Sequence, residues 1–282
     1  MKPSSSDAFN SPLPEADDVI PARQLAVITG ASCGIGYELA RQFAEHDFDL
    51  VIAAEDAGIV EAQQALKGMG AEVEAVCVDL STHDGVDTLC RLISDVGRPV
   101  DALAVNAGVG VGGDFTRETD LSAEISMINL NIVSAVHLAK HVLPEMVARG
   151  TGRVLFTSSI ASTRPGPFFA VYAATKAFIQ SFAQGIREEL KDTGVTVTAL
   201  MPGPTDTNFF VRAGMDDTPA GEGRKDDPGD VAREGFEALM AGKDHVVAGS
   251  FKNKVQQFSS HFLSEPVKAK ATRQQTEPHS HQ

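Results

Sequence analysis

Short, continuous apolar runs recur along the chain, and the longer segments between them carry apolar residues at helical spacing. Each run is four to six residues long, which suits a strand that is buried on both faces. The seven runs lie at residues 25–28, 50–53, 73–78, 102–105, 153–157, 195–200 and 245–248.

The segments between these runs are expected to be helices. In the first of them, Ile35, Leu39 and Phe43 follow one another at intervals of four residues and so share one helical face. The expected helices lie at residues 34–46, 58–68, 83–96, 120–149, 170–191 and 228–241. In the long helix at 120–149 we expect a kink at Pro144. Strands that alternate with helices form right-handed βαβ units, so the pattern predicts an α/β fold with a doubly wound parallel sheet.

Composition changes only near the two ends. Residues 1–22, rich in serine, proline and acids, are expected to be a disordered arm. Residues 23–250 show no break and predict one domain. The tail at 251–282 is expected to be partly helical or disordered: Val255, Phe258 and Phe262 fit one face of a short helix before Pro266, and we expect disorder beyond it.

Charge and cysteine content narrow the class of protein. A net charge of −14 with a pI near 4.9 argues against nucleic acid and anionic membrane surfaces as partners. The three cysteines lack metal-ligand spacing and are expected to be reduced thiols, and no metal is expected. The absence of an 18-residue apolar run and of a signal-peptide pattern predicts no membrane span and a cytoplasmic location.

A glycine-rich turn joins the first expected strand to the first expected helix. Gly30, Gly34 and Gly36 allow a tight turn and a close approach of the backbone to a pyrophosphate. The N-terminus of the following helix offers free N–H groups and the positive end of its dipole. The turn therefore predicts dinucleotide binding.

Acidic residues end the second and third expected strands. A carboxylate at Glu55 or Asp56 accepts hydrogen bonds from ribose hydroxyls and repels a 2′-phosphate. No basic residue occurs at 53–58 or in the glycine turn, so we favour NAD, with NADP possible. The alternative is that these acids only begin a loop. Asp79 is expected to contact the adenine amino group, unless it is an ordinary turn acid.

Tyr172 and Lys176 lie one turn apart on an expected helix. A nearby ammonium favours phenolate and would lower the tyrosine pKa toward the range of an acid/base catalyst. Taken alone, the pair is equally compatible with an ordinary helix surface.

Five motifs in order, over about residues 24–250, resemble the short-chain dehydrogenase/reductase family. They are Thr29-Gly30-x-x-x-Gly34-x-Gly36, Asn106-Ala107-Gly108, Ser159, Tyr172-x-x-x-Lys176 and Pro202-Gly203. The resemblance implies a Rossmann-type sheet of seven parallel strands, a bound dinucleotide and a catalytic tetrad of Asn, Ser, Tyr and Lys.

The resemblance also assigns roles. Tyr172 would exchange the proton of the substrate oxygen, and Lys176 would lower the tyrosine pKa and bond the nicotinamide ribose. The family's serine stands thirteen residues before the tyrosine, which selects Ser159 over Ser158 to bond the substrate oxygen. Hydride would pass between the nicotinamide and the substrate carbon.

The fourth member of the tetrad is expected in the long helix. Its distance from Pro144 selects Asn131, with Asn129 as the competing candidate. The family role of this asparagine is to hold a water that links Lys176 to solvent.

The cofactor contacts implied by the resemblance come from the glycine turn, the ends of strands and the catalytic helix. They are Gly30, Ser32, Cys33, Gly34, Ile35, Gly36, Glu55, Asp79, Leu80, Asn106, Ala107, Gly108, Tyr172, Lys176, Pro202, Gly203 and Thr207. Two positions depart from the family pattern. Cys33 stands where a small or basic residue is frequent, and Ala54 stands where NAD-dependent members usually have aspartate.

The substrate is expected to be an apolar alcohol or ketone. Phenylalanines at 168, 169, 209 and 210 and valines at 109 and 111 are candidates to line its pocket, or else to fill the core. The polar loop at 205–228 is expected to close over the pocket. The resemblance implies a homodimer or homotetramer built on the helices at 120–149 and 170–191. The alternatives are a non-catalytic dinucleotide sensor and an epimerase or dehydratase of the extended branch, which the short chain after Pro202 disfavours.

Overall fold

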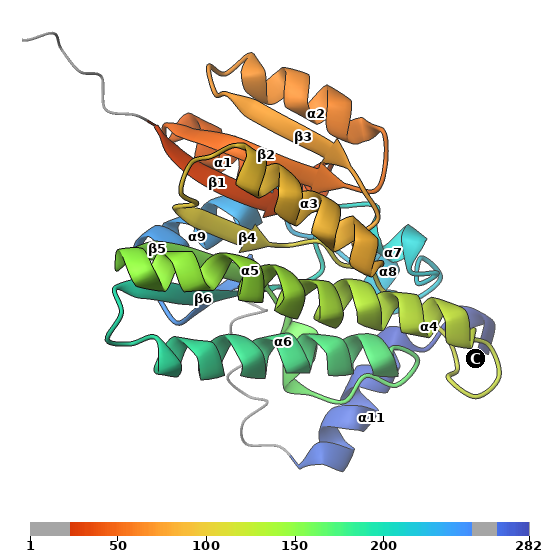
Figure 1. Ribbon diagram of the computed structural model, residues 1–282. Helices are drawn as coiled ribbons and strands as arrows, with labels where there is room; N and C mark the ends of the chain where they lie inside the picture. The colour runs from red at the N-terminus through yellow and green to blue at the C-terminus, as the bar shows by residue number, and fades with distance from the viewer. Residues whose placement is uncertain (1–22, 250–263, 282) are drawn as a thin grey trace, which may run out of the picture.

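The computed structural model describes residues 23–249 and 264–281, which are built around one seven-stranded parallel sheet (Figure 1). The strand order is β3-β2-β1-β4-β5-β6-β7. The strands are β1 Gln24–Thr29, β2 Phe48–Ala54, β3 Val73–Cys77, β4 Ala102–Val105, β5 Gly152–Thr157, β6 Val195–Pro202 and β7 His245–Ala248. All seven expected strands are present, and the predicted doubly wound α/β fold is confirmed.

Helices cover both faces of this sheet. The helices of eight or more residues are α1 Gly34–Glu45, α2 Gly58–Lys67, α3 His83–Asp95, α4 Leu121–Ile128, α5 Ser134–Arg149, α6 Ala170–Glu189, α9 Pro228–Met240 and α11 Glu265–Thr276. Figure 1 shows α3, α5 and α6 in front of the sheet and α1 and α9 behind it.

The alternation of side chains along β1 divides the core into two layers. Leu25 and Val27 pack with Leu89 of α3 and Leu138 of α5 on one face of the sheet. Ala26 and Ile28 pack on the other face with α1, α2 and α9, where Phe43 lies edge-on to Phe236 with ring centres 5.1 Å apart. Since β1 is buried on both faces, its sequence is a continuous apolar run rather than an alternating one.

The position of β1 fixes where a ligand can enter. It pairs in parallel with β2 on one side and with β4 on the other. The chain leaves the two strands in opposite directions, which opens a crevice at their carboxyl ends. Both the glycine turn and the segment Asn106–Gly108 lie at these ends.

The long helix changes its geometry near its middle. A π-helical stretch, η1 Asn129–Val133, separates α4 from α5 and widens the turn that carries Asn131. Pro144 lies inside α5, and the expected kink at Pro144 stays a prediction. Hydrogen bonds made by Asn131, described below, hold the wide turn in place.

The span Leu121–Arg149 is long and apolar enough, by length and composition, to cross a membrane, with a mean hydropathy of 1.3 over 18 residues. It is the one such helix among the residues described. Here one side of it packs against the sheet through Leu138, Val142 and Met146. A helix that packs in a protein core can have the same length and apolar composition as one that crosses a membrane.

The chain beyond Pro266 is helical, which corrects the expectation of disorder there. Pro266 stands in the first turn of α11, where its missing N–H costs no hydrogen bond. The Thr276 hydroxyl donates to the carbonyl of Pro167 at 2.6 Å, and ion pairs such as Lys268–Glu265 support the helix. Amino-acid composition does not reveal tertiary contacts of this kind.

The expected arm at 1–22 and the helix carrying Val255, Phe258 and Phe262 lie outside the described residues.

Candidate active site

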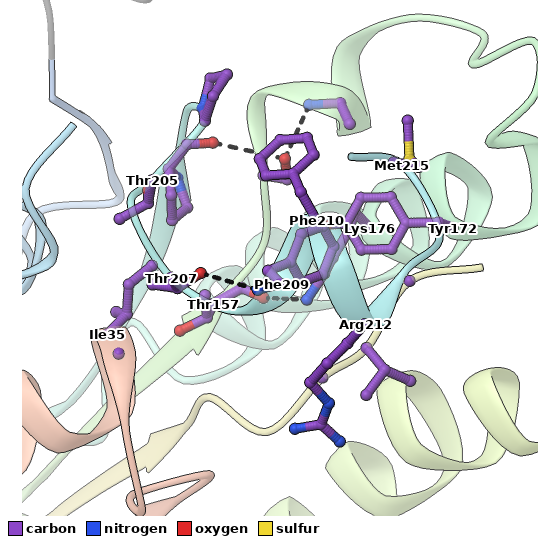
Figure 2. Close-up of a pocket in the computed structure, with 18 of the residues that line it drawn as sticks. Ile35, Thr157, Tyr172, Lys176, Thr205, Thr207, Phe209, Phe210, Arg212 and Met215 are labelled. Carbon is purple, nitrogen blue, oxygen red and sulfur yellow. Dashed lines mark hydrogen bonds between the residues drawn. The ribbon is translucent and has the colours of Figure 1, made fainter. Parts of the chain in front are cut away.

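A single cavity of about 760 Å³ opens above the carboxyl ends of the strands. Its lining runs from the glycine turn, past the catalytic helix α6, to two short helices in the 205–228 loop, α7 Phe209–Arg212 and α8 Pro219–Glu222. Part of α11 also contributes. Figure 2 shows the region around Tyr172 and Lys176.

The glycine turn has the shape that a pyrophosphate requires. Gly30 and Gly34 have φ angles of +68° and +57°, which side chains rarely adopt. A Cβ at Gly36 would lie 2.0 Å from the carbonyl oxygen of Gly30, so only glycine lets α1 pack this closely. Helix α1 begins at Gly34 with no side-chain cap and no acid in its first turn, and its N–H groups remain available to an anion. These features fit a dinucleotide.

Thr29 ties the glycine turn to the neighbouring strand end. Its hydroxyl oxygen accepts hydrogen bonds from the backbone N–H groups of Asn106 and Ala107, both at 3.0 Å. The amide of Asn106 donates in turn to the carbonyl of Thr29, and its oxygen accepts from the hydroxyl of Thr157 at 3.0 Å. Asn106 therefore positions the ends of β1, β4 and β5 around the crevice.

The acids expected to bind the adenosine ribose are already paired. Glu55 forms an ion pair with Arg212 of α7, which reaches across from the 205–228 loop. Asp56 accepts hydrogen bonds from the Ser32 hydroxyl at 2.8 Å and from the Gly58 backbone at 3.0 Å. The residues next to Glu55 in the sequence gave no sign of this partner, because Arg212 lies 157 residues away along the chain.

Asp79 does not line the cavity, although both of its neighbours in the sequence do. Val78 and Leu80 line the cavity, whereas Asp79 is exposed and accepts a hydrogen bond from the Ser81 backbone at 2.8 Å. Thr82, the N-cap of α3, donates to the Asp79 carbonyl. Asp79 therefore lies in the turn that precedes α3.

Tyr172 and Lys176, the candidate catalytic pair, lie on the inner face of α6, and both side chains are buried. The Lys176 ammonium donates to the carbonyl of Thr157 at 2.9 Å, at the end of β5. It lies 5.7 Å from the centre of the Tyr172 ring. Thr175 precedes Lys176 in the sequence, and its hydroxyl donates a hydrogen bond to the Tyr172 carbonyl.

Burial sets the pKa values of this pair. Burial raises the pKa of Tyr172 to about 12, although a hydrogen bond with Ser159 acts in the opposite direction. Burial also lowers the pKa of Lys176 to about 8, because the charged ammonium is removed from water. The expected lowering of the tyrosine pKa is therefore wrong for the protein without cofactor. At 5.7 Å the ammonium does not offset the desolvation of phenolate.

The two serines at the end of β5 have different environments. The Ser159 hydroxyl accepts from the Ala161 backbone at 3.1 Å, begins the short helix η2 Ile160–Thr163 and donates to the Pro202 carbonyl at 3.5 Å; it is also the group that counteracts the raised pKa of Tyr172. The Ser158 hydroxyl instead donates to the Lys176 carbonyl at 3.0 Å and is buried there. The contact with Tyr172 agrees with the choice of Ser159.

Asn131 is buried behind Lys176. Its amide donates to the Val109 carbonyl at 2.9 Å and to the Thr175 hydroxyl at 3.0 Å, and its oxygen accepts from the Val109 backbone at 3.0 Å. A Cβ at Gly108 would lie 3.1 Å from the Asn131 oxygen and 3.2 Å from the Lys176 nitrogen. Asn129 lines a separate, shallow hollow on the far side of η1. The wide turn of η1 thus brings Asn131, and not Asn129, to the lysine.

Aromatic side chains surround the Tyr172 ring. Phe169 stacks on it with ring centres 4.1 Å apart. Phe209 lies tilted to the same ring at 5.3 Å (Figure 2). Phe210 and Met215 complete this apolar cluster. Of the candidate phenylalanines, Phe168 does not line the cavity, and the Arg273 guanidinium lies over its ring at 5.2 Å.

Several residues that line the cavity were missed by the sequence analysis. They are Thr157, Arg164, Thr205, Arg212, Met215, Arg224, Thr272, Gln275 and Thr276. Pattern alone gives no signal for the loop and tail residues, because their approach to the cavity depends on long-range packing.

The remaining residues that are expected to contact the cofactor line the same cavity. Cys33 and Ile35 flank the N-terminus of α1, and Pro202, Gly203 and Thr207 line the cavity after β6. The Thr207 methyl lies close to the glycine turn, since a Cβ at Gly34 would meet it at 2.9 Å. The turn and the segment after β6 thus face each other across the cleft.

Comparison with known proteins identifies the family. The short chain dehydrogenase family model matches residues 24–217, so this chain belongs to the short-chain dehydrogenase/reductase family. An uncharacterized oxidoreductase of Staphylococcus saprophyticus is 31% identical over 219 residues, covering 77% of this chain and 91% of that protein. Serine 3-dehydrogenase of Agrobacterium fabrum is 31% identical over 189 residues, covering 67% and 75%.

A solved relative carries a cofactor. The short-chain dehydrogenase of Sphingobium yanoikuyae in complex with NADPH is 28% identical, with a TM-score of 0.74, covering 79% of this chain and 87% of that chain. Together with the glycine turn, these matches make the protein an NAD(P)-dependent dehydrogenase/reductase.

Proposed function

We propose that the protein interconverts a secondary alcohol and a ketone, with Tyr172 as the general acid/base. The observation that carries the proposal is the meeting of Tyr172 and Ser159 in one cavity with the glycine turn, with buried Lys176 on the same helix face as the tyrosine. Bound nicotinamide would supply or accept the hydride. The protein's own residues orient the substrate oxygen and handle its proton.

Each residue has a distinct task in this proposal. Ser159 donates a hydrogen bond to the substrate oxygen, which aligns the carbonyl carbon and stabilises developing negative charge. Tyr172 gives its proton to that oxygen during reduction and takes it back during oxidation. The Lys176 ammonium, fixed by the Thr157 carbonyl, favours the phenolate and is placed to bond the cofactor ribose.

Asn131 fixes the geometry around the lysine. Its amide bonds both the segment after β4, through Val109, and the catalytic helix, through Thr175. It therefore acts as a positioning residue in this proposal, and its backbone carbonyl remains a candidate holder for the water that links Lys176 to solvent.

The pKa values favour one direction at neutral pH. With a pKa of about 12, Tyr172 is a phenol and a ready proton donor, which suits ketone reduction. Oxidation begins with phenolate, whose population rises with pH. We infer that reduction is the faster direction near neutrality.

We propose NAD as the preferred cofactor, with NADP accepted. Glu55 at the end of β2 disfavours a 2′-phosphate, but its ion pair with Arg212 offsets that repulsion. The pairing therefore supports only a small preference between the two cofactors.

The proposed substrate has an apolar body. Phe169, Phe209 and Met215 form an apolar wall beside Tyr172, which suits an alkyl or aryl ketone.

We also propose a cytoplasmic homodimer or homotetramer. Its interface would use apolar side chains exposed on the outer helices, namely Ile125, Val133 and Phe178, which are 47%, 50% and 40% exposed.

The direct test is the absorbance at 340 nm of purified protein with NADH or NADPH and a panel of alkyl and aryl ketones. The proposal predicts substrate-dependent oxidation of the cofactor. Tight binding of dinucleotide with no turnover of any ketone or alcohol would favour a non-catalytic sensor instead.

A further inference from the structure

Besides the aromatic side chains around Tyr172, the cavity is lined by polar residues of α11, namely Thr272, Gln275 and Thr276, and by Arg164, the residue that follows η2. Arg164 and α11 belong to neighbouring segments, because the Thr276 hydroxyl bonds the carbonyl of Pro167, three residues after Arg164. Helix α11 lies beyond residue 217, where the match to the family model ends.

Helix α11 is held against the catalytic segment. The Thr276 hydroxyl donates to the Pro167 carbonyl at 2.6 Å, two residues before the Phe169 ring that stacks on Tyr172. The Arg273 guanidinium lies over the Phe168 ring at 5.2 Å. Beyond the helix, the His279 backbone donates to the Asp217 carbonyl at 3.1 Å. These contacts fix α11 as a wall of the cavity rather than a loosely attached tail.

Of the side chains that α11 presents to the cavity, the Gln275 amide alone has donor protons that are not already used within the described residues. The Thr272 hydroxyl donates to the Lys268 carbonyl and the Thr276 hydroxyl to Pro167, so these two protons are already used. The half-buried Gln275 amide makes no side-chain hydrogen bond to other described residues. Its NH₂ group can therefore donate to a ligand.

Arg164 adds a positive charge to the lining of the cavity. It follows Ser159 by five residues, and burial lowers the pKa of its guanidinium below the usual value. A guanidinium has five N–H donors, so a contact with the protein leaves others for a ligand. Arg224 and Asp226 also line the cavity and carry opposite charges.

We propose that Arg164 and Gln275 form a subsite for an anionic group, such as a carboxylate, at the end of the substrate remote from the reacting carbonyl. The substrate class is then a ketone, or the matching alcohol, with an apolar middle and an acidic end. A carboxylate there would receive charge-assisted hydrogen bonds from the guanidinium and a neutral one from the amide. The subsite rests on the proposed function, because Tyr172 and Ser159 define the reacting end.

The test compares two ketones that differ only in the remote group, acetophenone and 4-acetylbenzoate. The wild-type enzyme with its preferred cofactor should reduce 4-acetylbenzoate with a kcat/KM at least about tenfold higher than acetophenone. Arg164→Gln should lower that ratio by about 10- to 100-fold, and Arg164→Lys should keep part of it, since the charge remains but the planar fork is lost. Gln275→Leu should lower the ratio by a smaller factor.

The neighbouring exposed Gln274, which does not line the cavity, supplies the matched control, because Gln274→Leu should leave the ratio unchanged. If wild type shows no preference, or if Arg164→Gln lowers both ketones equally, the anionic subsite is refuted while the proposed function stands. If neither ketone nor any other in the panel is reduced, the proposed function fails and the subsite falls with it.

Discussion

Lys176 places its ammonium 2.9 Å from the carbonyl oxygen of Thr157, so the end of β5 fixes this buried lysine in the lining of the cavity. The same ammonium lies 5.7 Å from the centre of the Tyr172 ring. In the protein without cofactor, burial therefore dominates the pKa values of both groups.

The first prediction concerns pH. Because burial raises the pKa of Tyr172 to about 12, phenolate is scarce near neutrality and its population rises with pH. Alcohol oxidation should therefore accelerate from about pH 7 to about pH 10, by at most about tenfold per unit. Ketone reduction should not accelerate over this range, because Tyr172 stays a phenol until the pH approaches its pKa of about 12. Initial rates at saturating cofactor measure both profiles, and an oxidation rate that falls with pH would show that another group is the base.

The second prediction concerns the ion pair between Glu55 and Arg212. Arg212→Gln leaves the Glu55 carboxylate unpaired beside the adenosine site, and the KM for NADPH should rise about tenfold more than that for NADH. Glu55→Gln removes the repulsion and should shift the preference toward NADPH. Arg233→Gln, which breaks an exposed ion pair on α9, is the control and should change neither constant. An equal effect of Arg212→Gln on both cofactors would contradict this account of cofactor choice.

The third prediction concerns the close packing of the glycine turn. A Cβ at Gly36 would lie 2.0 Å from the Gly30 carbonyl oxygen, so Gly36→Ala must displace the turn. It should cost about 1–3 kcal/mol of stability and weaken binding of both NADH and NADPH. Gly185→Ala on α6 is the opposite case, because a Cβ there meets nothing within 4 Å. That variant should raise the stability by about 0.4–1 kcal/mol without changing cofactor binding.

Chemical denaturation and fluorescence titration of the reduced cofactor measure the two effects of these glycine variants. Normal cofactor affinity in Gly36→Ala would show that the turn does not cradle the phosphates.

Most of the fold could be predicted from the sequence, because each strand of β1 to β7 is a short, mainly apolar segment and the helices between them carry periodic apolar stripes. The positions of Tyr172, Lys176 and Gly36 followed for the same reason, since each lies at a fixed place within one element. Local pattern carries this information directly.

The errors arose where distant segments meet. The pairing of Glu55 with Arg212 depends on the path of the 205–228 loop, and the helical structure of α11 is supported by the contact of Thr276 with Pro167.

The π-helical turn at Asn131 could not be predicted from the sequence, because the Asn131 side chain bonds Val109 and Thr175, which are distant in the sequence. The raised pKa of Tyr172 likewise reflects burial in three dimensions, which spacing along a helix does not reveal.

The central claim is that the hydroxyl of Tyr172 moves the substrate proton, and the most direct measurement compares Tyr172→Phe with Tyr37→Phe. These are the two tyrosines of the chain, and Tyr37 lies on α1 away from the cavity. Steady-state rates of ketone reduction and alcohol oxidation, with the dissociation constant of the reduced cofactor, are measured for both. The account predicts that Tyr172→Phe loses at least about 10²-fold in kcat in both directions with nearly unchanged cofactor affinity, while Tyr37→Phe keeps its activity. Turnover by Tyr172→Phe close to that of the wild type would contradict the account.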